Sequence, residues 1–370
     1  MPVQDMGLIK DIYNEQFYRA FALSLTKTLP DFNQEEFMER ALADAFYQME
    51  WKERVKHTTE VLHHFMPKDF AQSAKLIEKI VAQLRADGFG EQQLVFMFLP
   101  DYIATYGLED YKNSINSLVF LTQFISAEFA IRPFLLKYGN QLMADMLHMS
   151  THENYHVRRF ASEGCRPRLP WGAAIPALKK DPTTILPILE NLKNDPSEYV
   201  RRSVANNLND ITKDNPEVVI SIAKKWVGKS KETDAIIKHA CRSLLKSGHP
   251  EILSFYGLDA QHLAISDFKI ETPKINIGDD VEFSFILKNN DKTERYIRLE
   301  YTVYYLKNNG SLAGKVFKIS EKSYPAGAEI HIKRKQSFRL ITTKTFYTGN
   351  HKLGIMVNGK EMAIADFELV

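Results

Sequence analysis

The chain has 370 residues, 44% of them hydrophobic and 25% charged, and a formal net charge of +2 at pH 7. A single hydrophobic core rarely extends over so long a chain, so we expect two domains or a repeat array joined to one domain. The chain has no run of about 18 apolar residues, and its N-terminal segment is too acidic for a signal peptide, so we expect a cytoplasmic protein without membrane spans.

The charges are unevenly distributed along the chain. Residues 1–150 contain 14 basic and 20 acidic side chains, residues 151–260 contain 17 and 13, and residues 261–370 contain 17 and 13. This positive excess after residue 150 is modest for a nucleic-acid-binding protein. Taken alone, it favours a solvated surface over a phosphate-binding one.

The first two thirds of the chain are predicted to be helical, because apolar residues recur with a period near 3.6. Leu118, Leu121 and Ile125 are one example. Short segments containing proline or glycine separate the helices. We expect a helical domain over residues 1–258.

The segment SAEFAIRPFLLKY, residues 126–138, contains one acid in apolar surroundings. Ser126 is a candidate helix cap there. Glu128 is either paired with Arg132, four residues later, or directed into a pocket. The residues themselves leave both possibilities open.

The segment ENYHVRRFASEGCRPRLPW, residues 153–171, is the most informative in the chain. Ser150 and Glu153 have the spacing of a capping box that begins a helix, and Gly164 is typical of a helix end. Glu163 then lies in the last turn, where the helix dipole disfavours an acid by about 0.3–1 kcal/mol. A compensating cation is expected nearby.

A basic loop broken by prolines, residues 166–170, follows this helix. It supplies Arg166 and leads to Trp171, whose flat face is suited to stacking. We interpret the whole segment as a functional site. The structural alternative for Glu163 is an ion pair with Arg159 in the preceding helical turn.

A weak internal repeat appears when VRRFASEG from Val157, VRRSVANN from Val200 and IKHACRSL from Ile237 are aligned. The spacings are 200 − 157 = 43 and 237 − 200 = 37 residues. Such periods are typical of helical pairs that stack into a curved solenoid.

The second repeat has its own start signal and its own acid near the helix end. Asp195 is expected to cap the helix, with Pro196 at its first position and Glu198 three residues after the cap. Asp210 occupies the position equivalent to Glu163, again against the helix dipole. The alternative for Asp210 is an ordinary capping turn.

Stacking of these repeats would align their basic residues along one edge of the solenoid. Such a row matches the spacing of charges on a phosphate backbone, although a solvated edge explains it equally well. The residues are Arg158, Arg159, Arg201, Arg202 and Lys238.

Several other kinds of site lack support. His152 and His156 are four residues apart, but no third ligand has a suitable spacing, so no metal site is expected. Cys165 and Cys241 are expected to be free, packed thiols. No phosphate-binding glycine loop or nucleophile elbow occurs, and we expect no cofactor.

From about residue 265 the pattern changes to strands with alternating apolar residues. Examples are VEFSFIL, IRLEYTVYYL and HKLGIMV, with turn signals such as Asn309-Gly310 and Asn358-Gly359 between them. About seven short strands over residues 265–370 predict an immunoglobulin-like sandwich. The predicted fold class is therefore mainly α, a helical-repeat solenoid followed by an all-β sandwich.

Three segments, residues 126–134, 157–172 and 200–216, resemble the signature segments of the AlkC family of alkylbase DNA glycosylases. This family is related to the AlkD family of HEAT-like-repeat proteins. The resemblance extends over about residues 1–255, and the terminal β domain is similar in pattern to the immunoglobulin-like domain of some AlkC proteins.

The resemblance implies excision of cationic methylated bases, 3-methyladenine and 3-methylcytosine, from duplex DNA. A monomer is the default expectation for the oligomeric state, which the sequence does not determine. It also implies DNA contacts from the β domain, for which the Lys333-Arg334-Lys335 strand and the region from Lys307 to Lys318 are candidates. The residues that match the family's catalytic carboxylates are Glu128, Glu163 and Asp210. Those that match its supporting or DNA-contacting residues are Arg159, Arg166 and Trp171.

The reaction that the resemblance implies is one that carboxylates can catalyse. A base alkylated at N3 is already cationic and leaves as a neutral molecule, so the enzyme must mainly stabilise an oxocarbenium-like sugar and position a water. No lysine nucleophile is implied, so strand cleavage is not expected. Two alternatives remain open, a helical-repeat scaffold for a protein partner and a damaged-DNA binding protein without catalysis.

Overall fold

The computed structural model describes residues 8–247, 249–256, 260–340 and 345–370. The chain divides into two compact units, Met1–Ala240 and Cys241–Val370. The predicted boundary at residue 258 falls among residues 257–259, outside the described residues. On either side of it, the last helix ends at Phe255 and the first strand begins at Leu263.

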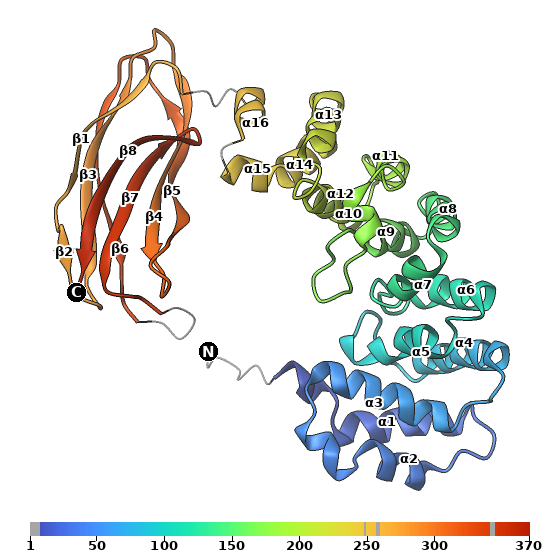
Figure 1. The fold of residues 1–370 in the computed structure, drawn as a ribbon. Coiled ribbons are helices and arrows are strands. Elements are labelled where there is room, and N and C mark those ends of the chain that lie inside the picture. Colours follow the sequence, from blue (N-terminus) through green and yellow to red (C-terminus); the bar gives the residue numbers. More distant parts are fainter. Residues whose placement is uncertain (1–7, 248, 257–259, 341–344) are drawn as a thin grey trace. The chain divides into compact units, whose positions relative to one another are not determined.

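The first unit consists of helices joined by short loops (Figure 1). Three 3-10 helices lie among them: η1 Ile9–Ile12, η2 Asp44–Gln48 and η3 Leu94–Met97. The α-helices are α1 Glu15–Thr26, α2 Gln34–Ala41, α3 Trp51–His64, α4 Phe70–Ala86, α5 Phe98–Tyr106, α6 Tyr111–Leu121, α7 Ile131–Tyr138, α8 Asn140–Met149, α9 Tyr155–Gly164, α10 Pro176–Lys180, α11 Leu186–Leu192, α12 Glu198–Ile211, α13 Pro216–Trp226 and α14 Lys231–Ala240.

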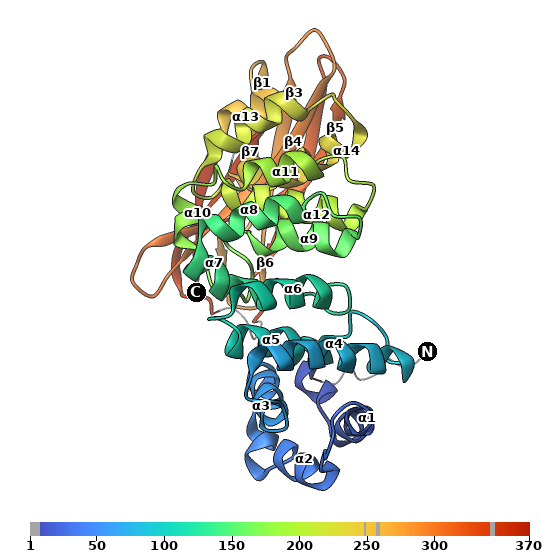
Figure 2. The same cartoon turned by 90° about the vertical axis from the view of Figure 1, so that its right-hand side faces the viewer.

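These helices form two layers that follow one curve. In Figure 1, α3, α5, α7, α9, α12 and α14 succeed one another along the inner side. Helices α4, α6, α8 and α11 belong to the outer layer, which Figure 2 shows face on. Within the inner layer α9 packs on α12 and α12 packs on α14, so the three repeat segments of the sequence lie on neighbouring helices, as predicted. Among the described residues, no helix is long and apolar enough to cross a membrane.

Two predicted helix starts are wrong. Helix α9 begins after Asn154, whose side chain accepts a hydrogen bond from the His156 backbone N–H at 2.8 Å. Ser150 still has helical backbone angles and ends α8, whereas an N-cap needs extended backbone. Likewise, Ser197 precedes α12. Asp195 instead accepts a hydrogen bond from the Ser197 backbone N–H at 2.8 Å and is buried.

The second unit contains two short helices, α15 Arg242–Lys246 and α16 Pro250–Phe255, and a β-sandwich. Its two sheets have the strand orders β1-β3-β6 and β2-β8-β7-β4-β5. Residues alternate between the core and the surface, as β3 shows along its whole length. The described strands number eight, one more than predicted: β1 Leu263–Ile270, β2 Lys274–Ile275, β3 Asp280–Asn289, β4 Arg295–Leu306, β5 Leu312–Tyr324, β6 Glu329–Ser337, β7 Gly349–Val357 and β8 Lys360–Leu369.

Candidate active site

A continuous chain of buried charges links three parts of the helical unit. Starting from the loop before α7, Glu128 pairs with Arg159 of α9 at 3.0 Å, and Arg159 reaches Glu163 at 3.5 Å. Glu163 in turn pairs with Arg166 at 2.7 Å, and Arg166 pairs with Asp210 of α12 at 2.8 Å. The structure therefore brings together the three carboxylates that the sequence singled out.

Arg166 binds two acids of this chain at once. Its Nη1 donates to Glu163 and its Nε donates to Asp210. Both acids end helices of the inner layer, so the guanidinium compensates the repulsion expected from the two helix dipoles. The side chains of Glu163 and Asp210 are only 7% and 3% exposed, so the cation is needed to keep two buried carboxylates side by side.

Glu128 differs from the other two acids in its surroundings. It lies in a turn before α7 and not inside a helix. Its Oε2 accepts a hydrogen bond from the Ser126 hydroxyl and forms an ion pair with Arg159, which itself donates to Ser126 Oγ. Its side chain is 13% exposed, and no described residue donates to its Oε1. Of the two alternatives left open for Glu128, the structure excludes the pairing with Arg132, since Glu128 pairs with Arg159. The predicted capping role of Ser126 is wrong, because α7 begins after Ala130.

Electrostatics hold the two arginines in the charged state. Burial by itself lowers the pKa of Arg159, but Glu128 and Glu163 outweigh this, so its pKa lies above the ordinary value. The pKa of Arg166 is raised in the same way, because Glu163 and Asp210 outweigh its burial. The chain of charges thus holds three acids and two buried arginines, and the buried guanidinium of Arg132 also interacts electrostatically with Glu163 and Asp210. The ammonium of Lys213, 3.2 Å from Asp210, is 45% exposed and lies outside this buried set.

Neutral side chains that the sequence did not single out complete the site. The Ser203 hydroxyl of α12 donates to Glu163 at 2.6 Å. The Tyr199 ring lies 4.8 Å from the guanidinium carbon of Arg159. Both residues lie on the same helix as Asp210, about two and about three turns earlier, so the helical spacing could have identified them as neighbours of the site.

Arg132 fixes the loop between α9 and α10. It is 1% exposed, and its Nη1 donates to the carbonyl of Gly164 at 2.9 Å while its Nε donates to the carbonyl of Ala173. These carbonyls stand before and after the segment that carries Arg166 and Trp171. Arg132 therefore sets the position of that segment, a role that requires the tertiary fold and leaves no signal in its own neighbourhood.

Trp171 stands at the exposed end of this loop. Its side chain is 65% exposed, and its φ of +66° lies in the left-handed region that only a few non-glycine residues adopt. Its carbonyl accepts a hydrogen bond from Lys52 Nζ at 3.0 Å, and its ring centroid is 6.0 Å from that of Trp51. The fold thus places an indole face toward solvent.

The predicted basic edge is only partly available for a ligand. Arg158 forms a two-pronged ion pair with Asp195, at 2.6 and 3.0 Å, which ties α9 to the start of the next repeat. Arg201 donates to the backbone carbonyls of Asp195 and Pro196. By contrast, Arg202 is exposed and forms only an ion pair within its own helix, and Lys238 is also exposed. We assign structural roles to the first two, and phosphate contact stays a prediction for the others.

Comparisons with known proteins extend these observations. A HEAT repeat model matches residues 185–214, and the model of the C-terminal Ig-like domain of the uncharacterised protein YhaZ matches residues 264–370. A Bacillus subtilis (strain 168) relative, described as uncharacterized protein YhaZ, is 38% identical over 365 residues, covering 98% of this chain and 100% of the relative. A solved structure of Pseudomonas fluorescens alkylpurine DNA glycosylase AlkC, bound to DNA containing an abasic site analog, is also 38% identical. The TM-score is 0.88, and 98% of this chain and 100% of that chain are covered.

The fold is thus a HEAT-like helical region followed by an immunoglobulin-like β-sandwich, as predicted from the sequence. Because the similarity to AlkC spans nearly the whole of both chains, the chain belongs to the AlkC family. It is homologous to a DNA glycosylase that has been solved with DNA bound.

Proposed function

We propose that this protein is a monofunctional DNA glycosylase that excises cationic alkylated bases, 3-methyladenine and 3-methylcytosine, from duplex DNA. The observation that carries the proposal is the cluster of three carboxylates, Glu128, Glu163 and Asp210, held in fixed positions by Arg159 and Arg166. Carboxylates fixed beside the substrate favour a reaction in which positive charge develops on the sugar in the transition state. Loss of a cationic base through an oxocarbenium-like sugar is such a reaction.

The surroundings of the carboxylates support different roles for them. Glu128 is the most exposed of the three and has one oxygen to which no described residue donates, so it contacts the sugar or the attacking water. Asp210 stabilises the developing positive charge from a fixed position, since Arg166 holds it. Glu163 holds both arginines and adds to the negative field. No base has to be protonated in this mechanism, because the leaving base already carries the positive charge.

The second unit is proposed to contact the DNA backbone. Lys333 and Lys335 on β6 are each 67% exposed, and they pair with Glu282 and Asp280 of the neighbouring strand at 3.1 and 2.8 Å. Such exposed pairs contribute little to stability, so both lysines can exchange their partners for phosphate groups.

The direct test is release of bases from methylated duplex DNA, with 3-methyladenine, 3-methylcytosine and 7-methylguanine separated by chromatography. The wild-type chain is expected to release the first two. The Asp210→Asn variant is expected to retain DNA binding and to lose most of the excision, because the carboxylate charge is gone while the side-chain shape is kept.

The matched control is Asp214→Asn, four residues after Asp210 and beyond the end of α12. Asp214 pairs with Arg168 at the surface, and its side chain is 24% exposed. This variant is expected to excise at the wild-type rate. Wild-type excision by Asp210→Asn would remove Asp210 from the mechanism, and tight DNA binding without release of any base by the wild-type chain would identify a binding protein instead.

A further inference from the structure

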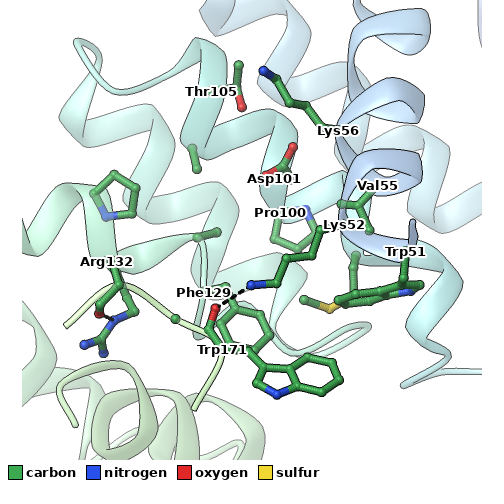
Figure 3. Close-up of a pocket in the computed structure, with 16 residues that line it drawn as sticks. Trp51, Lys52, Val55, Lys56, Pro100, Asp101, Thr105, Phe129, Arg132 and Trp171 are labelled. Carbon is green, nitrogen blue, oxygen red and sulfur yellow. Dashed lines mark hydrogen bonds between the residues drawn. The ribbon is translucent and has the colours of Figure 1, made fainter. Parts of the chain in front are cut away.

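Aromatic side chains form two groups near the candidate site. Figure 3 shows the first group, Trp51 and Trp171, which line a pocket that includes none of the three carboxylates. The second group consists of Tyr155, His156 and Tyr199, at the starts of α9 and α12. Its two tyrosines are 43% and 39% exposed, and their rings meet edge to face with centroids 6.5 Å apart. Tyr199 is the member whose ring lies over an arginine of the chain of charges.

That arginine is Arg159, and its close polar contacts among the described residues are made by one nitrogen. Its Nη1 donates to the Ser126 hydroxyl and lies 3.0 Å from Glu128. Its Nη2 is 3.5 Å from Glu163, farther than an ordinary hydrogen bond of about 2.7–3.2 Å. Arg166, by contrast, donates to two acids from two different nitrogens. The polar contacts therefore fix the plane of Arg166, whereas they leave Arg159 free to pivot about Nη1.

The ring of Tyr199 restricts this pivoting. The guanidinium carbon of Arg159 lies over the ring, 4.8 Å from its centroid, and a planar guanidinium stacks favourably on an aromatic face. With the ring in place, the side chain of Arg159 is only 12% exposed. Burial raises the pKa of the Tyr199 phenol, Arg159 lowers it and Glu128 raises it, so both members of the ion pair act on this residue. Tyr199 thus covers the Arg159–Glu128 pair from one side.

We propose that Tyr199 is a positioning residue of the site, which fixes the guanidinium of Arg159 and, through it, the carboxylate of Glu128. Glu128 is the most exposed of the three acids, and Arg159 and Ser126 hold its Oε2, so motion of Arg159 passes directly to it. A carboxylate stabilises developing charge best from a fixed position, because no reorganisation is then needed during the reaction. The ring of Tyr199, and not its hydroxyl, has this role. The inference rests on the proposed function, since it takes Glu128 to act in base excision.

The test follows the motion of Arg159 directly, by NMR relaxation of its Nε–H group in the full chain. The signal is identified by its absence from Arg159→Lys. Tyr199→Leu removes the ring and is expected to lower the order parameter of this group, whereas Tyr199→Phe keeps the ring and is expected to retain the wild-type value. Tyr199→Gln, which suits the exposed first turn of α12, replaces Tyr199→Leu if that variant does not fold.

The matched control is Tyr155→Leu, the same change in the neighbouring exposed ring. Among the described residues, the ring contacts of Tyr155 are with His156 and Tyr199. This variant is expected to keep the wild-type order parameter at Arg159.

Excision is measured on the same variants at saturating enzyme, so that its rate is separated from DNA affinity. Tyr199→Leu is expected to be about tenfold slower at unchanged DNA affinity, and Tyr199→Phe to stay within about twofold of the wild-type rate. Arg159→Lys replaces the planar cation by a compact ammonium that does not stack in the same way. In this background Tyr199→Leu is expected to cause no further loss, because the two residues act as a unit.

An unchanged order parameter in Tyr199→Leu would overturn the proposal. So would additive losses in the double variant, since Tyr199 would then act independently of Arg159. A loss of DNA affinity in both Tyr199→Leu and Tyr155→Leu, at an unchanged excision rate, would overturn it as well and make the two tyrosines a DNA contact. If the wild-type chain releases no base while Tyr199→Leu still lowers the order parameter of Arg159, the glycosylase is refuted and the positioning of Arg159 by Tyr199 stands.

Discussion

Arg166 is expected to be the most important single residue for the integrity of the site, and Arg166→Met tests this. Methionine keeps an unbranched side chain of similar length but removes the cation shared by Glu163 and Asp210. All three side chains are less than a tenth exposed, so water cannot replace the guanidinium without reorganisation of the fold.

The size of the effect follows from this burial. Breaking a buried ion pair by removing one partner costs about 3–5 kcal/mol. For a helical unit of this size, each kcal/mol lowers the melting temperature by about 2–4 °C, so Arg166→Met is expected to lower it by about 6–20 °C.

A second arginine in the same loop serves as the control for Arg166→Met. Arg168, two residues further, pairs with Asp214, but these side chains are 37% and 24% exposed. An exposed pair is worth about 0–1 kcal/mol, so Arg168→Met is expected to lower the melting temperature by no more than about 4 °C. Both variants are measured by thermal unfolding, followed by circular dichroism of the helices.

A pH series adds a second readout. Without the guanidinium, the facing carboxylates of Glu163 and Asp210 repel each other, and uptake of a proton relieves this repulsion. The deficit in unfolding free energy of Arg166→Met is therefore expected to shrink as the pH is lowered from about 7 to about 5. Equal melting temperatures for the two variants, or a deficit independent of pH, would refute the argument that Arg166 neutralises a buried acid pair.

Further predictions concern other parts of the chain. Burial raises the pKa of the Cys165 thiol to about 12 and that of the Cys241 thiol to about 11. Neither thiol is therefore expected to react with a thiol reagent at pH 8 in the folded protein, whereas both should react after unfolding. Gly172→Ala would place a Cβ 3.0 Å from Cδ of Arg132, whose two hydrogen bonds to backbone carbonyls hold it in place. We expect the free energy of unfolding, measured by chemical denaturation, to fall by about 1–3 kcal/mol. Gly90→Ala, which meets only the exposed Gln93 amide, should cost less. Replacing Lys333 and Lys335 by alanine is expected to reduce the slope of log affinity for DNA against log salt by about one per lost phosphate contact, and an unchanged slope would exclude these lysines from the DNA interface.

Short-range signals in the sequence were sufficient for the fold. The period of 3.6 in the first part and the alternation in the second act over a few residues, so they predicted a helical-repeat region and a β-sandwich before any contact was known. They were less accurate at element ends, because Ser150 and Asn154 are both acceptable caps and only the end of α8 decides between them.

The repeat and the position of acids at helix ends singled out Glu163 and Asp210, and the resemblance to the AlkC family added the chemistry expected of them. The sequence did not predict that Arg166 pairs with both acids. Arg166 and Asp210 are 44 residues apart, and they meet because α9 and α12 pack side by side.

Only the tertiary structure shows which arginines belong to the candidate site and which connect helices of the fold. Arg158 and Arg159 are neighbours in the sequence, yet one ties two repeats together through Asp195 and the other lies between two acids of the site. Arg132 could have paired with Glu128, four residues earlier, but it donates to a carbonyl 41 residues away. Local sequence therefore determined which residue types face the inner layer, whereas the partner of each charge depended on the packing of distant helices, because a charge buried by that packing must pair with whatever group the neighbouring helix or loop presents.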